Sequence, residues 1–289
     1  MEEYRVFYSR SVPYKGIINI PDTGKEKYPA AILVHGHSRQ KNDGLDRLAE
    51  VLAENEIASF RYDMPGCGSS RNNSNDYLDD WVRSLRDAVT YLSYDPKIDD
   101  DRIATAGISL GGSTVVVAAA LEDRIKCTAS MAAVADFKKN FGGSWAKEGW
   151  ELCEKDKKEA VLTGVSGVMT NPYMCGIQGE AEKERIKVIL QEQWDGFMNN
   201  VYVSIESVND LMRTAPGRYA PLIKNPILYL HGSADECVLH ENAYYLYENT
   251  PQTTEKELVF IDGCDHNMPI DPHREEVFAE IVKWYKKYL

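Results

Sequence analysis

The sequence lacks any stretch that approaches the roughly 18 consecutive apolar residues of a membrane-spanning helix. Its first ten residues include two glutamates and no apolar core of a signal peptide. The six cysteines form no Cys-x-x-Cys pair and no dense framework, so we expect reduced thiols and a cytoplasmic location. No cluster of His, Cys and carboxylate residues has metal-ligand spacing, and the sequence therefore implies no cofactor.

Positive charge is also scarce. The chain has 33 Lys and Arg residues against 45 Asp and Glu residues, a formal net charge of -12. Such a surface repels phosphate backbones and anionic lipid headgroups, so we expect neither nucleic acid nor a membrane as a partner. A small-molecule substrate is the expected partner, and the oligomeric state stays open, with a homodimer as one alternative.

What the sequence does contain is an alternation of short β-rich runs with longer helical patterns. This alternation predicts an α/β fold with a mostly parallel sheet and helices on both faces. Runs near residues 5–9 and 15–20 are expected to add antiparallel edge strands. The predicted strands are residues 30–36, 57–63, 102–109, 126–134, 226–232 and 256–262, and the predicted helices are residues 44–54, 75–94, 110–122, 241–248 and 272–289.

One segment, Asp136 to Ala220, interrupts this alternation because it contains no convincing buried strand. Within it, residues 180–197 place apolar side chains at helical spacing. The segment also holds three of the five tryptophans, Trp145, Trp150 and Trp194, which are our candidates for lining a substrate pocket. The predicted domains are therefore a core of residues 1–135 and 221–289 and a helical cap of residues 136–220.

Ser109 is the strongest candidate for chemistry. It lies at the centre of a Gly-x-Ser-x-Gly motif, residues 107–111, directly after a predicted strand and before a predicted helix. Glycines at these positions allow a sharp turn that lifts the serine hydroxyl above the sheet. The N-terminus of the following helix favours developing negative charge.

A serine hydroxyl needs a base, and a neutral imidazole needs an acid that fixes its tautomer. Asp235 and His266 each follow a predicted strand, and the carboxyl ends of parallel strands share one edge of the sheet. We therefore expect both to converge on the serine. Asp136 is a rival for the acid, while His240 and His273 are rivals for the base.

These features resemble the serine hydrolases of the α/β-hydrolase superfamily. The resemblance rests on the chain order of nucleophile, acid and histidine, on HG at residues 35–36 and on YDxxGxG at residues 62–68. Within the superfamily, the chain is most similar to feruloyl and cinnamoyl esterases of bacteria. It departs from them in its HGHS run at residues 35–38, which leaves the acyl group of the substrate open.

The resemblance implies a role for each candidate. Ser109 is the expected nucleophile, His266 the general base and then acid, and Asp235 the orienting acid. The expected oxyanion hole consists of the backbone N–H groups of His37 and Leu110.

The expected activity is cofactor-independent hydrolysis of carboxylic esters through an acyl-enzyme. An acyltransferase or a peptidase that uses the same residues is an alternative. A catalytically silent binding protein on this fold is disfavoured, because all three catalytic positions carry competent side chains.

Two of the cysteines are candidates for a disulfide. Cys237 and Cys264 each lie two residues from the expected acid or base, on loops that should be neighbours. The sequence leaves open whether they form a disulfide, although reduced thiols fit a cytosolic protein better.

Overall fold

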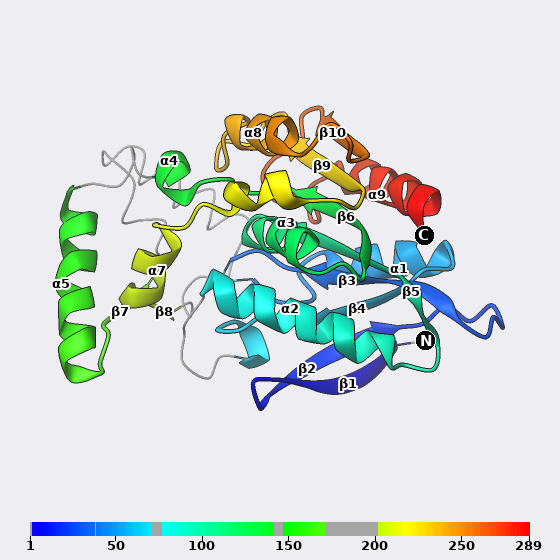
Figure 1. The fold of residues 1–289 in the computed structure, drawn as a ribbon, viewed down its shortest axis with the longest axis horizontal. Coiled ribbons are helices and arrows are strands. Elements are labelled where there is room, and N and C mark those ends of the chain that lie inside the picture. Colours follow the sequence, from blue (N-terminus) through cyan, green and yellow to red (C-terminus); the bar gives the residue numbers. More distant parts are fainter. Residues whose placement is uncertain (1, 38, 71–76, 142–146, 171–201) are drawn as a thin grey trace.

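The computed structural model describes residues 2–37, 39–70, 77–141, 147–170 and 202–289. Its central feature is an eight-stranded sheet with the order β1-β2-β4-β3-β5-β6-β9-β10 (Figure 1). The strands are β1 Glu2–Ser9, β2 Val12–Asn19, β3 Tyr28–Val34, β4 Ala58–Tyr62, β5 Ile98–Ile108, β6 Ile125–Met131, β9 Ile227–Gly232 and β10 Lys256–Ile261.

The sheet is parallel except at one edge, where β1 pairs with β2 and β2 with β4 in antiparallel fashion. The central strands are buried on both faces. In β3, for example, Ala30 and Ile32 belong to the apolar cluster on one face, whereas Ala31 and Leu33 belong to the cluster on the other. The predicted fold class and the predicted edge strands are confirmed.

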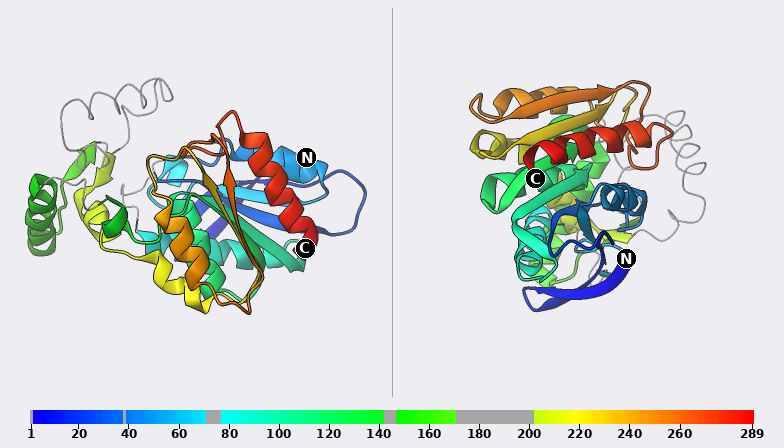
Figure 2. Two further views of the ribbon diagram at one scale, coloured as in Figure 1. Left: turned by 90° about the horizontal axis from the view of Figure 1, so that it is seen from above. Right: turned by 90° about the vertical axis from the view of Figure 1, so that its right-hand side faces the viewer.

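Helices cover both faces of this sheet (Figure 2). Trp81 of α2 packs in the same cluster as Ile32, while Leu48 of α1 and Phe278 of α9 pack with Leu33 on the opposite face. All five predicted core helices are present, with ends shifted by a few residues. They are α1 Leu45–Glu54, α2 Leu78–Ser93, α3 Leu110–Leu121, α8 Glu241–Asn249 and α9 Arg274–Tyr288.

The segment between β6 and β9 contains a two-stranded antiparallel sheet in addition to the expected helices. Each of its strands has three residues, too few for an alternating pattern to be recognised in the sequence. The helix expected at residues 180–197 lies outside the described residues. The described elements are α4 Phe137–Phe141, α5 Lys147–Thr163, β7 Val168–Thr170, β8 Tyr202–Ser204, α7 Ile205–Leu211 and the 3-10 helix η4 Pro216–Leu222.

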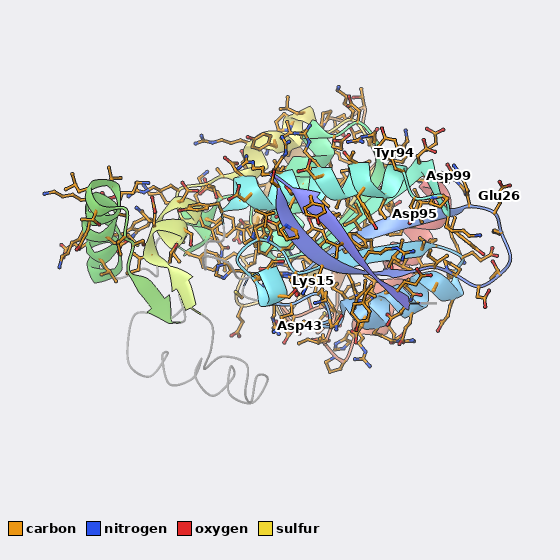
Figure 3. The ribbon with its side chains drawn as sticks, turned by 90° about the horizontal axis from the view of Figure 1, so that it is seen from below. Lys15, Glu26, Asp43, Tyr94, Asp95 and Asp99 are labelled. Atoms are coloured by element: carbon orange, nitrogen blue, oxygen red, sulfur yellow. The ribbon has the colours of Figure 1, made fainter. Side chains whose placement is uncertain are left out.

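The inserted elements α5, β7, β8 and α7 lie on the side of the core that the carboxyl ends of the parallel strands face (Figure 1). Both chain termini lie at the opposite end. Figure 3 places Tyr94, Asp95 and Asp99 at that far end as well. None of the described helices is long and apolar enough to cross a membrane.

Asp63 shows what the YDxxGxG run does structurally. Its fully buried carboxylate accepts hydrogen bonds from the backbone N–H and the Nζ of Lys41, at 2.9 and 2.7 Å, and from the N–H and hydroxyl of Ser69. Gly68 has a φ of +46°, and a Cβ there would lie 2.5 Å from the Asp63 carboxyl carbon. Burial opposes ionisation, but the bonds from Lys41 and Ser69 prevail and lower the pKa of Asp63. The run therefore ties two loops together.

Candidate active site

Ser109 lies between the end of β5 and the start of α3. Its backbone conformation, with φ 58° and ψ -120°, is one that residues other than glycine rarely adopt. Two glycines permit this turn. A Cβ on Gly107 would lie 2.2 Å from the carbonyl oxygen of Gly111, and one on Gly111 would lie 2.4 Å from the carbonyl oxygen of Val34. The turn thus requires both glycines, and the strained position holds the serine at the edge of the sheet.

The structure brings the three sequence-predicted residues together. The hydroxyl oxygen of Ser109 lies 3.0 Å from Nε2 of His266, and Nδ1 of His266 lies 2.9 Å from Oδ2 of Asp235. With the Nδ1–H donating to the carboxylate, Nε2 is left to accept the hydroxyl proton of Ser109. The three residues follow different strands, β5, β9 and β10. Their side chains meet because the parallel strands end at the same edge.

The environment of Asp235 keeps its carboxylate charged. Burial opposes ionisation, but electrostatic attraction to the His266 ring, hydrogen bonds from His231 and His266, and the Val238 N–H together hold the pKa of Asp235 well below the usual range. Its Oδ1 accepts the N–H groups of Cys237 and Val238 at 2.9 and 2.8 Å. The Nε2 of His231 lies 3.3 Å from Oδ2.

His231 is a partner of the acid that no sequence motif indicates. It lies four residues before Asp235 and is almost completely buried, and its Nε2 also lies 2.8 Å from the carbonyl oxygen of Val238. The spacing alone was a weak signal, because a histidine at the end of a buried strand is more often bonded to backbone than to a functional group.

Backbone hydrogen bonds fix the loop after β9 relative to the loop after β10. Ser233 donates its N–H to the carbonyl of Ile261, and Ala234 donates to that of Cys264, both at 2.9 Å. A Cβ on Gly232 would lie 2.2 Å from the Cys264 carbonyl oxygen, so a larger residue would force the loops apart. The relative position of acid and base is therefore set largely by the main chain.

The cysteines on these two loops are not joined. Cys237 is an exposed free thiol and Cys264 a buried one. Burial raises the pKa of the Cys264 thiol to about 12, so this thiol is protonated at neutral pH. The structure contains no disulfide between Cys237 and Cys264, and their reduced state stays a prediction.

The rival candidates are engaged elsewhere. Asp136 accepts the N–H of Lys139 at 3.0 Å and so caps α4. His240 directly precedes α8, and its Nε2 lies 3.1 Å from the backbone carbonyl oxygen of Gly232 at the end of β9. Nδ1 of His273 lies 2.7 Å from Oδ1 of Asp271. Among the described residues, His, Cys, Asp and Glu side chains form no group of three or more that could hold a metal ion.

The predicted oxyanion donors flank the serine. Leu110 is the first residue of α3, where N–H groups have no acceptor within the helix. The loop after β3 lies against the serine from the other side, since a Cβ on Gly36 would be 3.4 Å from the Cβ of Ser109. His37, the next residue, is buried, and both ring nitrogens of His35 are bonded to backbone groups, which stabilises the loop. The role of His37 and Leu110 stays a prediction.

Arg39 adds a link between two loops that the sequence did not reveal. Its guanidinium donates to the side-chain oxygen of Asn267, directly after the candidate base. Asn267 in turn donates its N–H to the carboxylate of Asp265 at 2.6 Å. The loop after β3 is thereby fastened to the loop that carries His266.

Of the three tryptophans predicted to line a pocket, only Trp150 lies within the described residues. Its half-buried ring packs against the apolar cluster of the core, and the guanidinium carbon of Arg213 lies 5.7 Å from the ring centroid. Packing thus accounts for its position, and its contact with substrate stays a prediction. Trp145 and Trp194 lie outside the described residues.

Comparison with known proteins identifies related chains along nearly the whole length. The family model described as "Serine aminopeptidase, S33" matches residues 26–273. A polyketide transferase, ATR5 of Stachybotrys chlorohalonatus, is 32% identical over 267 residues, which cover 87% of this chain and 86% of that protein.

Two solved structures share the fold. The α/β hydrolase GrgF from a Penicillium species superimposes with a TM-score of 0.81 at 19% identity, over 100% of this chain and 99% of that chain. Est1E from Butyrivibrio proteoclasticus, with ferulic acid bound, superimposes with a TM-score of 0.68 at 21% identity, over 98% of each chain. At such identities the likeness is one of fold.

Proposed function

The chain belongs to the serine aminopeptidase S33 family of α/β hydrolases, and from this premise we propose that it cleaves carboxylic esters through an acyl-enzyme on Ser109. One observation carries the proposal: a continuous chain of hydrogen bonds runs from the hydroxyl of Ser109 through His266 to the buried, ionised carboxylate of Asp235. This arrangement is what a serine nucleophile needs to attack at neutral pH.

In the first step the hydroxyl oxygen of Ser109 attacks the ester carbonyl, and Nε2 of His266 takes the proton. The imidazolium that forms is stabilised by the carboxylate of Asp235, which remains unprotonated because its pKa is depressed. The carbonyl oxygen becomes negative in the tetrahedral intermediate. We assign its stabilisation to the backbone N–H groups of His37 and Leu110, with support from the N-terminus of α3.

Collapse of this intermediate breaks the bond to the alcohol. His266 returns its proton from Nε2 to the leaving oxygen, and Ser109 carries the acyl group. A water molecule then attacks the acyl carbonyl while His266 again accepts a proton, and release of the acid restores the serine hydroxyl. Every proton in this cycle passes through Nε2 of one histidine, so no cofactor is needed.

We assign substrate selection to the inserted segment, residues 136–220, as a cap over a core formed by residues 1–135 and 221–289. The residues that perform attack and charge stabilisation do not contact the remote parts of an ester, so discrimination must come from other surfaces. The position of α5 and α7 on the side of the strand ends supports this assignment (Figure 1). The free thiols of Cys237 and Cys264 are consistent with a cytoplasmic location.

A second candidate is acyl transfer through the same residues. The polyketide transferase ATR5 is similar along most of its length, which favours an acceptor other than water for at least some relatives. A peptidase is a further alternative, named by the family description. All three activities pass through an acyl-enzyme. They differ in the substrate that forms it, an ester or a peptide amide, and in the acceptor that takes the acyl group, water or another nucleophile.

The decisive experiment combines a fluorophosphonate probe with a panel of p-nitrophenyl and hydroxycinnamoyl esters. We expect the probe to label the wild-type protein and not Ser109→Ala, while circular dichroism shows both folded. Turnover of esters in the presence of added alcohols and amines, analysed by mass spectrometry, separates hydrolysis from transfer, and peptide amides test the peptidase. Full labelling of Ser109→Ala would exclude Ser109 as the nucleophile.

A further inference from the structure

Asn140 lies on α4, the first helix of the inserted segment, yet its side chain contacts the loop that carries Asp235. Its Nδ2 donates to the carbonyl oxygen of Cys237 at 3.1 Å, and its Oδ1 accepts the N–H of Leu239 at 3.0 Å. One side-chain amide thus pairs with a carbonyl and an N–H two residues apart, as a neighbouring β-strand would. This bidentate contact fixes both the position and the direction of the loop.

A second asparagine holds Asn140 in place. Asn242, near the start of α8, donates from Nδ2 to Oδ1 of Asn140 at 2.7 Å and to the carbonyl of Leu239 at 2.9 Å. Its Oδ1 accepts the N–H of Ala135 at 2.9 Å, where the chain leaves the core for the insertion. Asn242 is buried, so its side chain has few alternative orientations. The amide of Asn140 is therefore oriented before any substrate binds.

The loop is held from the other side by the acid itself. Cys237 and Val238 donate their N–H groups to Oδ1 of Asp235, while the carbonyl of Cys237 accepts from Asn140. Cys237 is thus anchored through both of its backbone polar groups, one toward the acid and one toward the insertion. If the outer contact is lost, the residue that holds the carboxylate is free to shift.

We infer that Asn140 is a positioning residue for the proposed reaction: through Cys237 and Leu239 it holds the carboxylate of Asp235 against His266. The inference rests on the proposed function of the three residues. It assigns the inserted segment a part in the chemistry as well as in substrate selection. A misplacement of about 1 Å can lower a rate about 100-fold. Because Asn140 contacts Cys237, which itself binds the carboxylate of Asp235, loss of this contact can lower the rate measurably.

The first test is Asn140→Ala, assayed with p-nitrophenyl acetate and by the rate of inactivation with a fluorophosphonate. Asn140 is only partly buried, so the variant should fold. We expect kcat and the inactivation rate to fall about tenfold, with KM changed less than about twofold, because the lost contact acts on the transition state. Asn249→Ala is the matched control, since its Nδ2 donates to the carbonyl of Tyr245 on α8, and it should leave both rates unchanged.

A double-mutant cycle separates positioning from general damage to the fold. In an Asp235→Asn background, Asn140→Ala should cause little further loss, because both changes disable the same group. Asn140→Asp keeps an acceptor for Leu239 but loses the donor to Cys237, and should be slowed at least as much as the alanine variant. Wild-type rates in Asn140→Ala, or equal losses in both backgrounds, would overturn the inference. A wild-type protein that does not react with the probe would instead overturn the proposed function, and the inference with it.

Discussion

Side chains at the strand ends of the sheet and side chains on helix α5 of the insertion differ in burial and in hydrogen bonding. At the strand ends, the carboxylates of Asp63 and Asp235 are fully buried and each accepts several hydrogen bonds. On α5 and just after it, Val161, Leu162 and Val165 are apolar and 67 to 73% exposed. The first region is held by polar contacts with fixed geometry, whereas the second offers apolar surface with few such contacts.

This difference separates two tasks. Attack and proton transfer need groups held within a fraction of an ångström, and buried hydrogen bonds between strand ends provide that precision. Binding an apolar acyl or alcohol group needs surface rather than fixed geometry. The comparison therefore predicts large losses from changes at the strand ends and selective, smaller effects from changes in the insertion.

The largest effect is expected from Asp235→Asn. Its amide can no longer hold the charged imidazole of His266 or enforce the Nδ1–H tautomer, so kcat should fall about 10³ to 10⁴-fold. The measurement is steady-state hydrolysis of p-nitrophenyl acetate. Asp136→Asn is the matched control: its side-chain oxygen can still accept the N–H of Lys139 and cap α4, so the variant should retain most of its activity. The reverse result would transfer the role of the acid to Asp136.

Asp63→Asn tests how much the buried polar contacts at the strand ends contribute to the free energy of unfolding. Breaking a buried ion pair with Lys41 should lower the free energy of unfolding by about 3 kcal/mol, measured by urea denaturation at pH 7. Because the pKa of Asp63 is lowered in the folded state, its stabilisation is present above the unfolded value of about 3.9 and is lost as pH falls through the folded pKa. The variant should therefore lose less stability than the wild type on acidification.

The same substitution in the insertion provides the contrast. Asp156 of α5 is buried and accepts the N–H of Gly167 at 2.6 Å and the hydroxyl of Ser166 at 2.7 Å. Asp156→Asn should loosen this local turn and change global stability less than Asp63→Asn. Equal losses would show that the insertion and the core unfold as one unit.

The pH dependence of kcat/KM tests which group at the strand ends titrates. The depressed pKa of Asp235 keeps its carboxylate ionised, so a loss of kcat/KM on acidification should report protonation of the base rather than of the acid. Below about pH 6, kcat/KM should fall about tenfold per unit. Activity that stays flat between about pH 5 and 8 would contradict a histidine base.

The smallest effect is expected from alanine substitution of the three tryptophans of the insertion. The variants are Trp150→Ala, Trp145→Ala and Trp194→Ala. On the proposal that these tryptophans line the substrate pocket, loss of one ring should alter the preference among bulky acyl groups about fivefold, with less effect on p-nitrophenyl acetate. Tyr94→Ala is the control, because this residue is 85% exposed and lies at the end of the molecule opposite α5 (Figure 3). Equal losses on all esters, at unchanged stability, would remove the specificity role from the insertion.

The core of the fold could be predicted because its signals are local. Continuous apolar runs identified the buried strands, and the glycines around Ser109 identified the turn before α3. In a parallel sheet, the position of a residue just after a strand already places it at the common edge, and this position predicts that Asp235 and His266 lie near Ser109. The role of these residues in catalysis stays a prediction that the variants above test.

Other features depend on contacts between distant segments. Nothing in the sequence near Asn140 or Asn242 indicates that the two side chains meet at the loop after β9, since they are about a hundred positions apart. The link from Arg39 to Asn267 joins even more distant positions. Three-residue strands such as β7 and β8 are invisible to periodicity for the complementary reason that they are too short.

By itself, the sequence determined the alternation of strands and helices, the strained turn at Ser109 and the edge at which the candidate residues gather, because each follows from local steric and apolar patterns. Only the tertiary structure decided that Asp136 caps a helix while Asp235 meets His266. It also decided that the thiols of Cys237 and Cys264 stay apart and that Asn140 reaches the loop of the acid. These outcomes depend on the direction of side chains across loops, and that direction is fixed only when the strand ends pack against each other.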